Sequence, residues 1–229
     1  MKILAIGAHP DDIEIFMYGF LAVCRDRGDD IFLAIATDGA AGGVFKGKQL
    51  ANQRKKEAIK GLHLLGKPFF FEFPDGQLDT IRDAKVHITT FINKIQPDLI
   101  ITHSHKDYHP DHRALSLLVK SSCSFKYPLI YCETLMGVNF KPDIYVDISK
   151  YFKEKKDAIL AHKSQSPEKF FKASKLMNRY RSAQCNFPDG FYAECYNIEQ
   201  VFPFADIRTK LPNGPAFNPY YTGNRRSFL

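Results

Sequence analysis

Short apolar runs alternate with longer amphipathic stretches through most of the 229 residues. The apolar runs cover 2–8, 31–37, 68–73, 98–103 and 129–133, and the amphipathic stretches cover 12–27, 49–65, 80–96 and 111–122. Strands separated by helices in this order form a mostly parallel sheet flanked by helices. The sequence therefore predicts a Rossmann-like α/β fold.

The predicted helices end at residues that stop a helix. Gly28 and Gly66 follow the first two, and Pro97 follows the third. A further strand is expected over 144–148, with helices over 149–162 and 166–180 after it. From 211 onward the chain is rich in Pro, Asn and Gly and is expected to be irregular. Because the length suits one domain, we predict a single domain over 1–210 and a tail over 211–229.

The composition is that of an ordinary globular protein, with 45% hydrophobic and 25% charged residues. The sequence contains no run of about 18 apolar residues that would span a bilayer. Its amino terminus lacks the length and the small-residue cleavage site of a secretory signal, so a cytoplasmic location is expected. The five cysteines are odd in number and form no C-x-x-C pair, which favours reduced core residues.

The formal net charge of +7 comes from basic residues that are dispersed along the chain, as around 54–56 and 153–156. No zinc-finger or RNA-binding signature accompanies them. We therefore expect a basic surface rather than a nucleic-acid partner. A phosphate or nucleotide group on a small substrate is compatible with this charge.

Polar side chains follow the ends of four predicted strands. They are His9 with Asp11 and Asp12, then "TDG" at 37–39, "PDG" at 74–76 and "HSHKDYHPDH" at 103–112. In open α/β sheets the ligand site lies outside the carboxyl ends of the strands. These segments therefore hold the candidate functional residues.

Two of these segments share the pattern His-Pro-Asp-x, at 9–12 and at 109–112, each at a strand-to-helix junction. Proline fixes such a turn, and an aspartate after it lies near the amino end of the helix. Two turns of this kind at adjacent strand ends would bring two imidazoles and one carboxylate onto one cation. That is the protein ligand count of a catalytic zinc site. One cluster alone is explained as well by helix capping and surface histidines, and the repetition favours the metal.

The motif "AHPDDIE" at 8–14, together with "HPDH" at 109–112, resembles the LmbE-like (PIG-L) family of zinc-dependent N-acetylglucosaminyl deacetylases. These two motifs are specific as a pair. Weaker matches follow in the family's order: "TDGAAGG" at 37–43, "RKKEA" at 54–58 ahead of "LLG", "PDGQL" at 74–78, "HKSQ" at 162–165 and "YAE" at 192–194. The resemblance covers most of the chain.

The resemblance implies zinc on His9, Asp12 and His112, with Asp11 as general base and His109 as the second catalytic group. The chemistry of these residue types agrees. Zinc activates water and polarises an acyl oxygen, a nearby carboxylate can move the proton, and a protonated imidazole can stabilise an oxyanion. Iron or another divalent ion in place of zinc remains open.

A third acidic residue, Asp111, is expected to hold the His109 ring and favour its imidazolium form, with helix capping as the alternative. Arg54 matches a family position associated with substrate contacts, and a solvated helix arginine is the alternative. Asp38 is expected either to bind sugar hydroxyls or to shape a turn. Tyr108 is a candidate for reaching the reacting carbonyl, and Tyr192 for bracing the site, with ordinary packing as the alternative.

Two further histidines, His103 and His105, are set aside as ligands because the family pattern takes only His112 from this loop. Their role stays open. The sequence departs from the family at Ile13, where glutamate is frequent, and in the bulkier residues 16–18 of the first helix. These changes leave the ligands in place and affect the expected shape of the substrate pocket.

The sequence thus predicts a metal-dependent hydrolase. Its expected reaction removes an N-acetyl group from an N-acetylglucosamine-type sugar on a glycoconjugate, nucleotide sugar or thiol-sugar precursor. The alternatives are hydrolysis of another amide or of a phosphoester, and a non-enzymatic basic module that binds anions. Whether the chain forms a homo-oligomer stays open.

Overall fold

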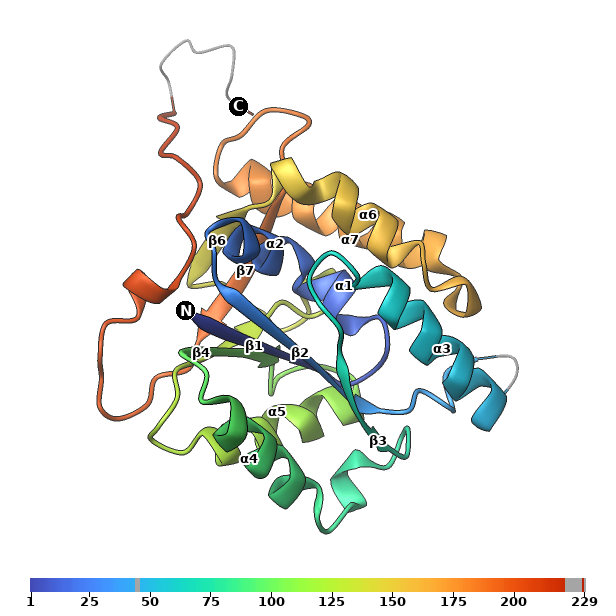
Figure 1. Cartoon of the computed structure of the whole chain (residues 1–229). Coiled ribbons are helices and arrows are strands. Elements are labelled where there is room, and N and C mark those ends of the chain that lie inside the picture. Colours follow the sequence, from blue (N-terminus) through green and yellow to red (C-terminus); the bar gives the residue numbers. More distant parts are fainter. Residues whose placement is uncertain (44–45, 221–227, 229) are drawn as a thin grey trace.

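A seven-stranded sheet forms the centre of the protein, with strand order β3-β2-β1-β4-β5-β7-β6 (Figure 1). This computed structural model describes residues 1–43, 46–220 and 228. The strands are β1 (Lys2–Gly7), β2 (Asp30–Thr37), β3 (Phe69–Phe73), β4 (Leu99–His103), β5 (Leu129–Cys132), β6 (Ile144–Asp147) and β7 (Ala193–Ile198). Strands β1 to β5 pair in parallel, whereas β7 runs antiparallel to both β5 and β6.

Helices cover both faces of the sheet (Figure 1). One face carries α1 (Asp12–Phe16), α2 (Tyr18–Asp26), α3 (Lys48–Gly61), α6 (Phe152–Ile159) and α7 (Pro167–Gln184), and the other carries α4 (Ala84–Ile95) and α5 (Pro110–Cys123). Short 3-10 turns lie at Leu78–Thr80, Leu135–Gly137, Ser149–Tyr151, Lys163–Gln165 and Arg208–Lys210.

Alternate residues of β1 enter the two apolar cores, as the two-residue period of a strand requires. Ile3 and Ala5 pack with α1, α2 and α6, while Leu4 and Ile6 pack with α4 and α5. The predicted single-domain α/β fold with a mostly parallel sheet is confirmed. The exact boundary between domain and tail stays a prediction.

The helix predicted over 12–27 is interrupted at Met17, whose φ of −130° is not helical. Groups from β7 replace the helical hydrogen bonds that the interruption removes. The Tyr196 hydroxyl donates to Glu194 Oε2 at 2.7 Å and lies 3.3 Å from the Phe16 carbonyl oxygen, and Glu194 accepts the backbone N–H of Phe20 at 2.7 Å. The break therefore depends on a strand that is distant in sequence.

The strand β7 itself was missing from the sequence prediction. Its segment carries a glutamate in the middle of the sheet, which is unfavourable for a buried strand unless the charge is paired. Lys155 of α6 supplies the pairing: its Nζ lies 2.7 Å from Glu194 Oε1, and both side chains are buried. The ion pair joins α6 to the sheet and accounts for a strand that the hydrophobic pattern did not reveal.

Two other helices begin later than predicted. The helix predicted over 80–96 is preceded by the 3-10 turn Leu78–Thr80, and the helix itself, α4, begins only at Ala84. The stretch 149–162 opens as a 3-10 turn before α6 and ends at Ile159. Residues 211–220 contain no helix or strand, as expected for the tail, and its residues 221–227 and 229 lie outside the described part of the chain.

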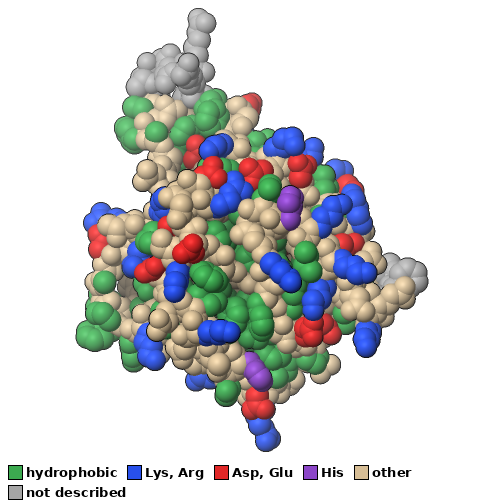
Figure 2. Space-filling model, in the orientation of Figure 1, with side chains coloured by type: hydrophobic (Ala, Val, Ile, Leu, Met, Phe, Trp, Pro, Cys, Tyr) green, Lys and Arg blue, Asp and Glu red, His purple; other side chains and the backbone are tan. Residues whose placement is uncertain are grey.

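On the face drawn in Figure 2, Lys and Arg side chains are scattered and interspersed with Asp and Glu. This agrees with a dispersed basic surface. All five cysteines are free, and four of them are buried. Within the described residues, none of the helices combines the length and the apolar character needed to cross a membrane.

Candidate metal centre and active site

Polar side chains converge at the carboxyl ends of β1 and β4, which are paired neighbours in the sheet. His9, Asp11 and Asp12 follow β1, and His112 lies in the first turn of α5, after β4. A cavity of about 360 Å³ opens at this edge, and all four side chains line it together with Arg54. Two sequence motifs about a hundred residues apart thus meet in one site.

The Asp12 carboxylate lies between two imidazole rings. Its Oδ2 is 3.3 Å from His9 Nδ1, and its Oδ1 is 3.3 Å from His112 Nε2. The backbone N–H of His9 also donates to Oδ2, at 2.6 Å. Candidate ligand atoms of His9, His109 and His112 lie within 4.8 Å of one another. These nitrogen and oxygen donors suit a divalent cation such as zinc.

The second nitrogen of each ring contacts a carboxylate. His9 Nε2 lies 3.1 Å from Asp75 Oδ1 and 3.2 Å from Asp111 Oδ2, and His112 Nδ1 lies 2.9 Å from Asp107 Oδ2. Outer carboxylates of this kind fix the tautomer and orientation of a metal-binding histidine. Sequence reasoning missed Asp75 and Asp107. The signals were present in "PDG" and "HKDYHPDH", but spacing alone did not reveal their partners.

The carboxylates give the site a negative field. Burial raises the pKa of Asp75, but the hydrogen bond and charge of His9, the Ala41 backbone N–H and the Arg54 charge together outweigh burial, and the pKa falls to about 2. Burial lowers the pKa of His112, yet Asp12 and Asp107 outweigh it and raise that pKa to about 9. Carboxylates that favour the protonated forms of His9 and His112 also favour a cation in place of those protons.

Asp11 occupies a strained position at the start of α1. Its φ of 131° lies in a region that favours glycine, and such strain often marks functional positions. Burial raises its pKa, although the Arg54 guanidinium acts in the opposite direction. Arg54 Nη2 donates to Asp11 Oδ1 at 3.2 Å and to the Pro10 carbonyl at 2.8 Å. Arg54 is buried rather than solvated, and it holds Asp11 and its turn in place.

His109 is the N-cap residue of α5 and is half-buried beside the cluster. Its Nδ1 accepts the backbone N–H of Asp111 at 3.3 Å. The Asp111 carboxylate was expected to hold the His109 ring. Burial lowers the pKa of that ring and the Asp111 charge acts in the opposite direction, but the ring is not the hydrogen-bond partner of the carboxylate. The carboxylate instead contacts His9 and accepts the backbone N–H of Gly76 at 2.8 Å, because the loop after β3 reaches into the site. Tyr108 lies at the cavity rim and is 52% exposed.

Two predicted substrate residues lie outside the residues that line the cavity. Asp38 Oδ1 accepts two backbone N–H groups, at 3.0 and 3.2 Å, and so shapes the loops after β2 and β3. The ring of Tyr192 stacks flat on Phe152, with centroids 3.5 Å apart. Their side chains are thus used in turn formation and packing, which are the alternatives considered for them.

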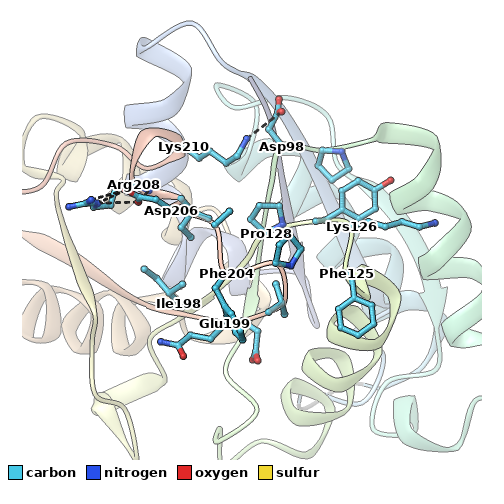
Figure 3. A pocket seen from close by; sticks show the side chains of 17 residues that line it. Asp98, Phe125, Lys126, Pro128, Ile198, Glu199, Phe204, Asp206, Arg208 and Lys210 are labelled. Atoms are coloured by element: carbon cyan, nitrogen blue, oxygen red, sulfur yellow. Dashed lines mark hydrogen bonds and ion pairs between the residues drawn. The ribbon is translucent and has the colours of Figure 1, made fainter.

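A larger cavity, of about 680 Å³, opens at the opposite edge of the sheet (Figure 3). Phe125, Ile198 and Phe204 contribute apolar side chains to it, and its Lys210 lies 3.7 Å from Asp98. Among the described residues, none of the groups with metal-ligand spacing lies there. The larger volume therefore does not mark the chemical site.

A profile of the PIG-L family, described as GlcNAc-PI de-N-acetylase, matches residues 4–123. The chain belongs to this family. It is 31% identical over 189 residues to diacetylchitobiose deacetylase of Thermococcus kodakarensis, covering 73% of this chain and 71% of that protein. It is 29% identical over 188 residues to a probable N-acetyl-alpha-D-glucosaminyl L-malate deacetylase of Bacillus cereus, covering 72% and 83%.

Solved structures of other proteins share the fold of this PIG-L chain. N,N'-diacetylchitobiose deacetylase from Pyrococcus horikoshii superposes with a TM-score of 0.76 at 25% identity, covering 86% of this chain and 83% of that one. A 4-carboxy-2-hydroxymuconate hydratase from Pseudomonas putida has the same TM-score at 21% identity, covering 90% and 98%. Because a hydratase shares the fold, the reaction must be argued from the site.

Proposed function

We propose that this PIG-L protein hydrolyses the N-acetyl group of an N-acetylglucosamine-type sugar, using a divalent metal ion. The observation that carries the proposal is the Asp12 carboxylate between His9 Nδ1 and His112 Nε2, with the buried Asp11 beside it. The deacetylase relatives support the choice of bond. The five carboxylates in and around the site argue against a module that binds anions.

In this proposal His9, Asp12 and His112 hold the ion, with zinc as the first choice and Fe²⁺ as the alternative. When bound, the ion supplies an activated water and polarises the acyl oxygen. The protein fixes the direction of both rings through Asp75, Asp111 and Asp107. His9 Nδ1 and His112 Nε2, the nitrogens that face Asp12, are then available to bind the ion.

Asp11 is the proposed general base. It lies next to a ligand in sequence, and Arg54 holds its Oδ1 at 3.2 Å. Burial raises its pKa, so it accepts a proton from water more readily than an ordinary aspartate does. The same carboxylic acid can later return the proton to the leaving amine.

His109 is the proposed donor to the oxyanion. Because its Nδ1 accepts the Asp111 backbone N–H, the proton of the neutral ring is on Nε2. An N–H at this position can stabilise the negative charge that develops on the acyl oxygen. Tyr108, which is half-exposed at the rim, is proposed to contact the substrate from the mouth of the cavity.

The proposed substrate is a small amino-sugar conjugate: a glycoconjugate, nucleotide sugar or thiol-sugar precursor. The cavity of about 360 Å³ is large enough for a sugar ring and open toward solvent, which suits a conjugate whose remainder stays outside. A cytoplasmic location is part of the proposal and fits five free cysteines.

The test combines metal analysis with a deacetylation assay on a panel of N-acetylglucosamine conjugates. The panel includes phosphate- and nucleotide-bearing members, and each is assayed with and without chelator. We expect about one metal ion per chain and chelator-sensitive acetate release. Phosphate release without acetate release would refute deacetylation and indicate that the protein is a phosphoesterase. A protein that binds no metal after reconstitution would refute the proposed ligand set.

A further inference from the structure

A third buried histidine contacts the proposed metal ligands. His103 ends β4 and is 1% exposed. Its Nε2 lies 3.1 Å from Asp12 Oδ2, and its ring stacks on that of His112 with centroids 3.8 Å apart and planes inclined by 16°. It therefore touches two ligands that come from different segments of the chain.

The stacking argues against His103 as a ligand of the same ion as His112. The lone pair of an imidazole nitrogen lies in the plane of its ring, so a bound ion lies in that plane too. Two nearly parallel rings stacked face to face place their lone pairs in separate planes. An ion bound well by His112 is therefore out of line with the His103 nitrogen.

The contacts around His103 place its proton on Nε2. Burial raises the pKa of Cys132 well above its ordinary value, so this residue stays a thiol, and its Sγ lies 3.9 Å from His103 Nδ1. A thiol there donates weakly to Nδ1, which leaves Nε2–H to donate to the Asp12 carboxylate.

The backbone N–H of Ala8 also points at His103 Nε2, at 3.1 Å. One nitrogen of a neutral ring cannot both accept from Ala8 and donate to Asp12. A hydrogen bond to an ionised oxygen is about twice as strong as one between neutral groups. The contact with Asp12 therefore decides the tautomer.

We propose that His103 is a positioning residue of the metal centre: its Nε2–H fixes Asp12 Oδ2, and its ring supports the ring of His112. With Oδ2 occupied by His103 and by the His9 backbone N–H, Oδ1 is left for the ion, on the side where His112 Nε2 lies 3.3 Å away. The inference rests on the proposed metal centre. It adds a residue that acts through Asp12 and His112 without binding the ion.

Four variants test the role of this nitrogen. His103→Phe keeps a ring that can stack but has no N–H, and His103→Gln offers an amide N–H that reaches toward Asp12. His103→Asn carries the same amide on a shorter side chain that falls short of Asp12. His105→Phe is the matched control, because His105 is exposed. Its ring packs on Tyr131, with ring centroids 5.4 Å apart, and not on the proposed metal ligands.

The measurement is the Zn²⁺ dissociation constant of each purified full-length variant, obtained by competition with a chromogenic chelator. The unfolding midpoint of each metal-free protein is recorded beside it. We expect His103→Phe to weaken binding ~10- to 100-fold, the range found for outer partners of metal ligands. His103→Gln should recover most of this loss, and His105→Phe should bind as the unchanged protein does.

Two outcomes overturn the inference. Unchanged affinity in a folded His103→Phe would mean that the nitrogen does not position Asp12. Loss of all binding in both His103→Phe and His103→Gln, with intact metal-free folding, would make His103 a ligand. If His103→Phe does not fold, the Zn²⁺ affinities of His103→Gln and His103→Asn are compared. Equal affinities overturn the inference, and tighter binding by His103→Gln supports it. Absence of metal from the unchanged protein refutes the proposed function instead.

Discussion

The cavities at the two edges of the sheet differ in how their charged side chains are partnered. At the carboxyl edge, Asp11 and Asp12 are buried and contact imidazoles and a guanidinium. At the opposite edge, the pair Arg208–Asp206 is exposed and the pair Lys210–Asp98 is partly exposed (Figure 3). Exposed pairs contribute little, because water competes for each charge.

The larger of these two cavities is therefore not the one that contains the candidate catalytic groups. The cavity of about 680 Å³ is nearly twice the size of the one of about 360 Å³, yet the smaller one holds the converging donor atoms. Buried polar groups are costly unless they are paired, so a fold that keeps several together usually uses them. Mutations at the carboxyl edge should change catalysis, and those at the opposite edge should change only stability.

The largest effect is expected from Asp12→Ala, because Asp12 contacts both of the rings proposed to bind the metal. We expect loss of bound metal and a fall in kcat/KM of ~10⁴-fold or more, since the ion serves both water activation and carbonyl polarisation. The matched change at the opposite edge, Asp206→Ala, should alter neither metal content nor rate. Metal analysis and acetate release measure both. Stoichiometric metal in Asp12→Ala would contradict the ligand assignment.

Asp11→Asn should separate catalysis from metal binding. The amide keeps the size of the side chain and tolerates the positive φ, but it cannot accept the proton of water. We expect metal content to stay the same while kcat falls ~10²- to 10⁴-fold, the usual contribution of a general base. Turnover at the original rate would rule out Asp11 as the base.

A smaller effect is expected from Gly42→Ala, which acts through Arg54. A Cβ on Gly42 would lie 2.7 Å from Arg54 Nη1, which must then shift and disturb its hold on Asp11. We expect kcat to fall about tenfold, equivalent to ~1.4 kcal/mol. Gly214→Ala is the control, because among the described residues its added Cβ meets only the Tyr145 carbonyl oxygen, at 3.5 Å. Equal rates in the two variants would mean that Arg54 adapts without moving Asp11.

The smallest effect is expected at the opposite edge, from Asp98→Asn. The Lys2 backbone N–H donates to Asp98 Oδ2 at 2.9 Å and holds the pKa of Asp98 below its ordinary 3.8. A lowered folded-state pKa stabilises the protein above the ordinary pKa, and this stabilisation is lost as the pH falls through the folded value.

For this surface group we expect a loss of ~0.5 kcal/mol near pH 6, which shrinks toward zero as the pH falls through the lowered folded-state pKa. Denaturant unfolding at pH 6 and at a pH below that pKa measures it, and acetate release should be unchanged. A loss that grows on acidification would mean that the pKa of Asp98 is raised in the folded protein.

The sequence alone determined the alternation of strands and helices as far as β5 and the local chemistry of the two His-Pro-Asp turns. The first strand, the turn at 9–12 and the helix start at Asp12 all depend on residues within a few positions of one another. The same holds for the turn that precedes α5. Local propensity and the hydrophobic period act over this range, which is why these predictions agree with the structure.

Only the tertiary structure decided which side chains meet. Asp111 lies 102 residues from His9, and His103 lies 91 residues from Asp12, so their contacts depend on the pairing of β1 with β4. The position of β7 depends likewise on the ion pair between Lys155 and Glu194, and the break at Met17 on polar contacts from β7 to α1 and α2. Spacing within a motif carries no information on such partners, because they are selected by sheet register and by the need to pair charges that folding has buried.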